Sequence, residues 1–204
     1  MTPQVELWRG SFGDAYIDRN APQDATLKAL HPMWVRMLER ARGLSTVLEV
    51  GANIGLNLRT LDRFLDADLT AVEPNAVARE RLLADGVVGK GRAIDAVAKA
   101  LPFDDDTFDL VFTAGVLIHV NPDDLARSCQ EMHRVSRKYV LCAEYYSATP
   151  REVPYRGMGG QLFLRDFGAF WMQTCPDLKL VDYGFFWTGA GAVDNLTWWL
   201  FQKH

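Results

Sequence analysis

The sequence is poor in the features that mark several classes of protein. It has three cysteines, Cys129, Cys142 and Cys175, with no C-x-x-C spacing among them. This number and spacing argue against a disulfide framework or a structural zinc site, and they favour reduced thiols that fill a core. No apolar run approaches the ~20 residues of a transmembrane helix, and the N-terminal segment has no charged-then-apolar signal pattern. We therefore expect a cytoplasmic protein without membrane contact.

An excess of basic charge is also lacking. The chain has 22 Lys and Arg against 26 Asp and Glu, for a formal charge of −4. Nucleic acids and anionic membranes select a basic surface, so we expect a small-molecule substrate and no nucleic-acid partner. An acidic run at Asp104–Asp106 is interpreted as a solvated turn, and no metal site is predicted.

Apolar residues make up 49% of the 204 residues, which is enough to bury one core. We therefore predict a single domain over residues 1–204. Apolar positions at three- and four-residue intervals predict a helix over residues 25–42. Helical periods recur later in the chain, at residues 56–65, 76–85 and 122–136.

Short runs rich in Val and Leu alternate with these helical segments. They predict strands at residues 46–50, 69–72, 108–114 and 138–144. Strands without polar alternation are buried on both faces, so this order predicts an α/β fold with a mostly parallel sheet and helices on both faces. Two aromatic runs, at residues 178–187 and 194–202, predict an antiparallel pair that closes the sheet.

The stretch "VLEVGANIGLNLRTL" places Gly51 and Gly55 between a strand and a helix, where ligands bind in an open parallel sheet. The spacing is not the G-x-G-x-x-G of dinucleotide binding, and no Lys-Ser/Thr follows to hold phosphates. Glu73 ends the next strand about twenty residues later, where a carboxylate can accept hydrogen bonds from ribose hydroxyls. Glu49, at the end of the first strand, can meet an amino group. A nucleoside with a cationic amino-acid tail would satisfy both carboxylates.

Four blocks in order, "LEVGANIGLNL", "LTAVEPN", "LPFDDDTFDLVFTAGVLIHV" and the aromatic closing pair, resemble the class I S-adenosylmethionine-dependent methyltransferases. The resemblance implies a Rossmann-like fold with a mostly parallel seven-stranded sheet, an antiparallel C-terminal strand and S-adenosylmethionine as co-substrate. It also implies a cofactor site. The methionine part would meet Glu49, Gly51, Asn53 and Gly55. The ribose would meet Glu73, and the adenine Pro74, Asn75, Asp95 and Ala96. The sulfonium would face Thr113, Ala114 and Gly115.

Further segments, among them "WRGSFGDAYIDRN", "AEYYSATPREVPYRG" and "LFLRDF", resemble a narrower group, the methylases found beside pseudaminic acid biosynthesis genes. This likeness implies a biosynthetic enzyme but leaves the acceptor open. The same outline is similar to enzymes that cyclise S-adenosylmethionine to azetidine-2-carboxylate and release methylthioadenosine. The chain departs from the group at "FFWTGAGAVDNLTWW" and "SATPRE", which leaves the substrate open.

Tyrosines are the candidates for lining the sulfonium, because aromatic faces stabilise positive charge. Tyr16 belongs to a predicted N-terminal arm over residues 1–24. Tyr145 and Tyr146 follow the fifth strand and open a long irregular segment, residues 145–165, which we interpret as a substrate loop that also holds Tyr155.

His119 in "GVLIHVNP" is a candidate general base, since an imidazole can accept a proton near neutrality. A structural histidine that fixes the turn is an equal alternative. Arg156 and Arg165 are candidates for holding a carboxylated substrate through paired hydrogen bonds. Arg19 with Asn20 would hold either such a substrate or the carboxylate of the cofactor, and surface ion pairs are the alternative for these arginines.

Three functions remain open from the sequence. The first is methylation of a small polar metabolite by in-line displacement, with the arm and the loop closing over the site. The second is cyclisation of S-adenosylmethionine itself, and the third, weaker, is a non-catalytic cofactor-binding partner. Monomer and homodimer are both compatible with the sequence.

Overall fold

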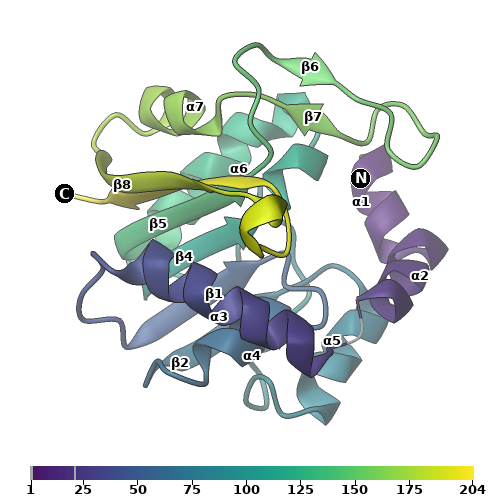
Figure 1. Cartoon of the computed structure of the whole chain (residues 1–204), viewed down its shortest axis with the longest axis horizontal. Helices are drawn as coiled ribbons and strands as arrows, with labels where there is room; N and C mark the ends of the chain where they lie inside the picture. Colours follow the sequence, from purple (N-terminus) through teal and green to yellow (C-terminus); the bar gives the residue numbers. More distant parts are fainter. Residues whose placement is uncertain (1, 21) are drawn as a thin grey trace.

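The computed structural model describes residues 2–20 and 22–204. Its main feature is a seven-stranded sheet in the order β3-β2-β1-β4-β5-β9-β8 (Figure 1). The strands span Thr46–Val50 (β1), Asp68–Val72 (β2), Ala93–Ile94 (β3), Phe108–Ala114 (β4), Ser136–Glu144 (β5), Lys179–Phe186 (β8) and Leu196–Gln202 (β9). Strands β3, β2, β1, β4 and β5 pair in parallel, whereas β9 pairs antiparallel with both β5 and β8. The predicted mostly parallel sheet with an antiparallel strand near the C-terminus is confirmed.

Helices cover both faces of this sheet. They span Pro3–Arg9 (α1), Ser11–Arg19 (α2), Asp24–Leu38 (α3), Leu56–Leu61 (α4), Ala76–Ala84 (α5), Pro122–Val135 (α6) and Phe167–Thr174 (α7), with short 3-10 helices at Leu117–His119 (η1) and Thr188–Ala190 (η2). Apolar residues of α3, α4 and α5 share one buried cluster with the sheet, and those of α6 and α7 share another. Neighbouring residues of one strand serve opposite clusters, as Val47 and Leu48 do, because successive side chains of a strand point to opposite faces.

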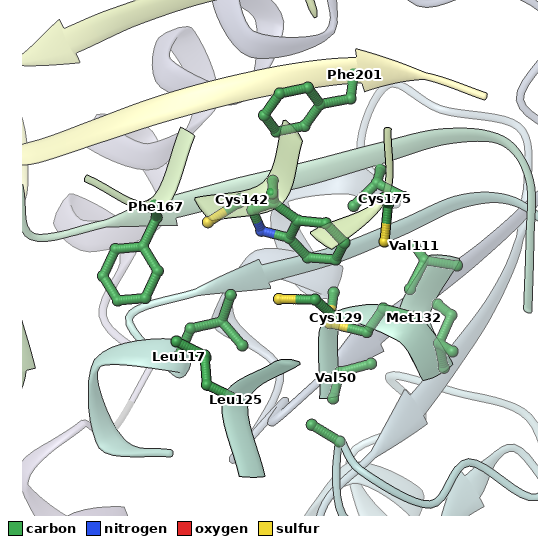
Figure 2. Packing of buried hydrophobic residues seen from close by; sticks show 14 of the residues in the cluster. Val50, Val111, Leu117, Leu125, Cys129, Met132, Cys142, Phe167, Cys175 and Phe201 are labelled. Atoms are coloured by element: carbon green, nitrogen blue, oxygen red, sulfur yellow. The ribbon is translucent and has the colours of Figure 1, made fainter. Parts of the chain in front are cut away.

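The three cysteines lie in the second cluster, where Figure 2 shows Cys129, Cys142 and Cys175 among apolar side chains that include Phe167 and Phe201. All three are buried and free. Burial raises the pKa of each thiol, so they remain neutral. Their predicted role as core residues is confirmed.

The N-terminal arm consists of the helices α1 and α2, joined at Gly10. In Figure 1 these two helices run along one side of the molecule, from the segment that carries β6 (Arg151–Glu152) and β7 (Phe163–Leu164) toward α5. Met1 and Ala21, which belong to the predicted arm, lie outside the described residues.

The segment after β5 is largely irregular, as predicted, and its only regular pairing within the described ranges is the antiparallel contact of β6 with β7. Several elements were not predicted, among them the helices α1 and α2 of the arm, strand β3 and helix α7. Strand β3 has two residues and lacks a pattern, and α7 is a short helix in which Phe167, Gly168 and Trp171 are buried. The predicted helix over 25–42 ends at Leu38. No helix within the described part of the chain is long and apolar enough to cross a membrane.

Candidate functional site

A cavity of about 230 Å³ lies at the carboxyl ends of β1, β2 and β4. The loops after these strands form its floor, and α1 and α2 contribute residues to its wall. Twelve of the residues predicted for the site line it: Tyr16, Asn20, Glu49, Gly51, Asn53, Glu73, Pro74, Asn75, Ala96, Ala114, Gly115 and His119. Ligands bind at this edge of open α/β sheets because the strands end there and leave a crevice between the loops.

Glu73 is fixed at the end of β2 by the loop that follows β1. Its Oε2 accepts a hydrogen bond from the Asn53 backbone N–H at 2.7 Å, and its Oε1 accepts one from the Asn75 backbone N–H at 2.8 Å. Asn53 has φ of 47°, a left-handed conformation that asparagine tolerates and that turns its N–H toward the carboxylate. Burial raises the pKa of Glu73. Each carboxylate oxygen retains a free lone pair, so Glu73 can still accept hydrogen bonds from a diol.

The glycine loop passes close to η1 on the other side of the cavity. Gly51 has φ of 80°, and a Cβ at this position would lie 2.7 Å from a methyl group of Val116. Only glycine satisfies both the conformation and the space.

Glu49 is the second carboxylate of the cavity, and it is 2% exposed. The Asn57 side-chain amide donates to its Oε1 at 2.7 Å, whereas its Oε2 is buried without a hydrogen-bond partner among the described residues. Burial raises the pKa of Glu49 to about 8. A buried carboxylate with a free oxygen is costly unless a donor meets it, so the site fits a ligand that carries an amino group.

The loop after β4 is held by Glu144, a residue that the sequence reasoning did not select. The Glu144 carboxylate accepts hydrogen bonds from the backbone N–H groups of Val116, Leu117 and Ile118 at 3.1, 3.0 and 3.4 Å. Burial raises its pKa to about 7. Because these three N–H groups begin η1, Glu144 fixes the path of the chain from Gly115 to His119.

His119 faces the cavity with a defined tautomer. Its Nδ1 lies 2.6 Å from the carbonyl oxygen of Gln161, and since a carbonyl only accepts, Nδ1 carries the proton in the neutral ring. Nε2 is then a proton acceptor. Burial lowers the pKa of His119, which keeps it neutral at lower pH. The ring packs against Trp8, at 5.0 Å between centroids, and Tyr155, at 4.8 Å.

The arm closes the wall of the cavity next to His119. Gln4 donates to the Gly160 carbonyl at 2.8 Å and accepts from Asn121 at 3.3 Å, which joins α1 to the loop over residues 145–165 and to the start of α6. Trp8 contacts Tyr16 at 5.2 Å between ring centroids, and burial raises the pKa of the Tyr16 phenol. Trp8 was not among the predicted site residues, because a single tryptophan in an exposed-looking segment gives no signal of its own.

The prediction for Asp95 needs correction. Its side chain does not line the cavity and is bound at the surface by Arg9, at 2.6 Å, and Arg79, at 3.2 Å. Asn75 likewise binds the arm, donating to Asp14 at 2.8 Å and to the Trp8 carbonyl at 3.2 Å. The arm thus occupies polar groups that the resemblance assigned to the adenine.

Three predicted positions support the site from behind. Gly55 begins α4 with φ of 77° and packs against Leu82 and Val87. Thr113 is fully buried in β4, one residue before Ala114. Tyr155 does not line the cavity but backs the His119 ring.

The remaining predicted residues are not brought to the cavity. Tyr145 donates to Asp194 in the loop before β9 at 2.5 Å, and burial raises its pKa. Tyr146 is 47% exposed. The guanidinium groups of Arg19, Arg156 and Arg165 lie over aromatic rings: Arg19 over Phe12 and Tyr16, Arg156 over Tyr155 and Arg165 over Phe170.

Part of the chain that forms this cavity matches a known protein family. Residues 48–142 match the methyltransferase domain family. The matched segment contains Glu49, the glycine loop, Glu73 and His119, and it ends within β5. A comparison with the sequences of curated proteins finds no match.

Solved structures extend the likeness to the whole chain. The Burkholderia thailandensis 1,6-didemethyltoxoflavin-N1-methyltransferase, solved with 1,6-didemethyltoxoflavin and S-adenosylhomocysteine, is 18% identical, with coverage of 100% of this chain and 91% of that one and a TM-score of 0.72. Magnesium protoporphyrin IX methyltransferase from Synechocystis, solved with S-adenosylmethionine, is 10% identical, with coverage of 100% and 99% and a TM-score of 0.68. The [4+2]-cyclase SpnF is 16% identical, with coverage of 86% and 81% and a TM-score of 0.64. At these identities the likeness establishes the fold, which is the Rossmann-like class I methyltransferase fold.

Proposed function

We propose that this chain binds S-adenosylmethionine in the cavity and transfers its methyl group to a small polar metabolite. The observation that carries the proposal is the pair Glu49 and Glu73, held in one cavity inside a segment that matches a methyltransferase domain. The unpartnered Oε2 of Glu49 fits the amino group of the methionine part, and Glu73 fits the two ribose hydroxyls. Gly51 and Asn53 lie between them, and Ala114 and Gly115 face the sulfonium.

When bound, the cofactor supplies a methyl group on a sulfonium. Attack on the methyl carbon would release a neutral thioether as the leaving group. The residues of this chain then have three tasks: to position the acceptor in line, to exclude water and to take its proton. Trp8 and Tyr16 cover the cavity, and their ring faces stabilise the sulfonium by about 1–2 kcal/mol each where water is excluded. The free Nε2 of His119 accepts the proton that an amine or hydroxyl loses as its bond to carbon forms.

The acceptor side of the proposal involves the arm and the loop. Arg19 and Arg156 both lie close enough to Tyr16 to lower the pKa of its phenol, although burial outweighs them. Arg156 has φ of 51°, a strained conformation for arginine that is concentrated at functional loops. The two guanidinium groups lie outside the cavity lining and, with Asn20, are suited to a carboxylate that extends out of the cavity toward the arm and the loop. Tyr146 and Arg165 pair at the two ends of the same loop and would contact only a larger acceptor.

Cyclisation of S-adenosylmethionine to azetidine-2-carboxylate, with release of methylthioadenosine, is a second candidate. It is favoured by the closed wall of the cavity, where Trp8, Tyr16 and His119 enclose the space next to Gly115. This reaction needs no second substrate. The nitrogen–carbon bond forms as the carbon–sulfur bond breaks, and the amine proton passes to a nearby base.

Two experiments test the proposal in sequence. Calorimetry with S-adenosylhomocysteine tests cofactor binding, and absence of binding would overturn both candidates. Mass spectrometry of products from S-adenosylmethionine alone, and then with a cell extract of the source, separates them. Methylthioadenosine and a four-membered imino acid from the cofactor alone indicate cyclisation, whereas S-adenosylhomocysteine formed only with extract indicates methyl transfer. Tight binding without turnover in either mixture would favour a non-catalytic partner.

A further inference from the structure

The cavity extends beyond the predicted cofactor residues at the end formed by the β3–β4 connection and α6. Its lining there continues from Ala96 to Lys99 and across to Asp124 and Ser128 of α6. The Lys99 ammonium lies 2.7 Å from Asp124 Oδ2, with side-chain exposures of 34% and 23%. The ion pair thus presents one donor and one acceptor side by side at the cavity wall.

The two segments are held together by buried contacts, so the position of the pair is fixed. Glu131 of α6 accepts from the Leu101 backbone N–H at 3.0 Å. Ala98 and Leu101 share a core cluster with Leu125 of α6. Ser128, which is buried, donates to the Asp124 carbonyl at 2.9 Å.

The order of the strands sets which part of a nucleoside reaches this end. Glu49 lies on β1 and Glu73 follows β2, while Ala96 follows β3, on the far side of β2 from β1. If Glu73 binds the ribose and Glu49 the amino-acid tail, the base extends from the ribose toward the β3 side. Asp95, the carboxylate that directly precedes Ala96, does not line the cavity, because its side chain is bound by Arg9 and Arg79.

We propose that Lys99 and Asp124 form the subsite that reads the hydrogen-bonding edge of the adenine, in place of Asp95. Adenine presents an exocyclic N6 amine, which is a donor, next to a ring nitrogen, which is an acceptor. Asp124 accepts from the amine and Lys99 donates to the ring nitrogen. Hypoxanthine replaces the amine with a carbonyl oxygen, which would face the Asp124 carboxylate with no proton between them. This assignment rests on the proposed function.

The experiment compares the affinities of S-adenosylhomocysteine and S-inosylhomocysteine by calorimetry. A matched bidentate edge contact is worth about 1–3 kcal/mol, so the wild-type chain should bind the adenosyl compound roughly 5- to 150-fold more tightly. Asp124→Asn should bring this ratio close to one, because a rotated amide offers a donor as readily as an acceptor. Lys99→Met should weaken the adenosyl compound at least about fivefold by the same arithmetic.

Two control variants sharpen the comparison. Asp123→Asn removes a charge from the neighbouring exposed position of α6 and should leave the ratio unchanged. Asp95→Asn should also leave it unchanged, although it loosens the arm. The assignment is overturned if Asp124→Asn keeps the wild-type ratio or if Asp95→Asn abolishes it. Should Asp124→Asn fail to fold in a thermal melt, Lys99→Met decides, and unchanged adenosyl affinity in that variant rejects the subsite.

Failure of the proposed function gives a different result. If the wild-type chain binds neither compound, the cofactor assignment is wrong and the adenine subsite is rejected together with it. If the wild-type chain binds S-adenosylhomocysteine but the Asp124 and Lys99 variants behave like wild type, only the adenine-edge assignment falls.

Discussion

Arg9 of the N-terminal arm donates two hydrogen bonds to Asp95 at the end of β3, at 2.6 and 3.3 Å. This pair joins residues 86 positions apart in the chain and holds α1 over the cavity. Arg9 is the main cause of the lowered pKa of Asp95, followed by the charge of Arg79. The arm is therefore attached to the loops that line the cavity through the residue that follows β3.

Loss of this attachment should expose the arm. We expect Arg9→Met to increase the rate at which chymotrypsin cleaves at Trp8, Phe12 or Tyr16, while the rest of the chain stays resistant. Arg81→Met, which removes an exposed ion pair with Asp85 on α5, is the matched control. Equal cleavage rates in the two variants would show that the pair does not hold the arm.

Glu73 should dominate binding of the ribose. Hydrogen bonds to a charged group contribute about 1.5–3 kcal/mol, so Glu73→Ala should weaken S-adenosylhomocysteine roughly 10- to 100-fold. Calorimetry gives the affinity, and a thermal melt controls for the loss of the contacts to Asn53 and Asn75. Glu80→Ala on the exposed face of α5 should bind like wild type. An unchanged affinity in folded Glu73→Ala would remove the residue from the site.

Glu49 should couple cofactor binding to pH. Its pKa is raised to about 8, mainly by burial, so the carboxyl is protonated at neutral pH in the free chain. A cationic amino group favours the carboxylate, and binding should release about one proton at neutral pH, with affinity rising up to about tenfold per pH unit until pH 8. Calorimetry in buffers of different ionisation enthalpy measures the proton, and Glu49→Gln should abolish its release.

The raised pKa of Glu49 also makes the free energy of unfolding depend on pH. A raised pKa means that the folded chain binds more protons than the unfolded chain between pH 4.5 and 8. The contribution of Glu49 to stability is therefore present at acidic pH and is lost as the pH rises through about 8. Unfolding of the cofactor-free chain in urea should show this decline, and Glu49→Gln should reduce its slope, while the raised pKa values of Glu73 and Glu144 leave part of it. A decline of equal slope in the variant would contradict the raised pKa.

His119 should act on turnover rather than on cofactor binding. General-base catalysis contributes about 10²- to 10⁴-fold, so His119→Gln should lower product formation by this amount while the affinity for S-adenosylhomocysteine stays near wild type. Because burial lowers the pKa of His119, activity should persist below the usual histidine range and fall as the ring becomes protonated. His133→Gln, at a surface contact with Asp177, is the control. Equal losses in both variants would assign His119 a structural role.

Replacement of the adjacent residues Tyr145 and Tyr146 should change stability by different amounts. Tyr145→Phe removes the hydrogen bond to Asp194 and should lower the free energy of unfolding by about 1.5 kcal/mol. Tyr146 is 47% exposed, and Tyr146→Phe should change stability by no more than about 0.5 kcal/mol and leave turnover unchanged. Urea denaturation and the product assay check both. Loss of turnover in Tyr146→Phe would restore this residue to the catalytic set.

Local sequence was a good guide where consecutive residues build one part of the site. Glu49, Gly51 and Asn53 sit on a strand and the turn after it, so their side of the sheet follows from the strand and the glycine spacing. Glu73 follows from the next strand in the same way. These residues line the cavity, as the pattern predicted.

Contacts between distant segments decided the rest. The sequence by itself determined the mostly parallel sheet, the edge at which the cavity lies and the two carboxylates that line it, because strand periodicity and turn chemistry act over a few residues. Only the tertiary structure showed that Gln161 fixes the tautomer of His119 from 42 positions away and that Glu144 caps the turn that presents it. It also turned Asp95 toward Arg9 and brought Lys99 to Asp124. Such choices depend on which side chains packing brings within hydrogen-bond reach, and no local pattern encodes them.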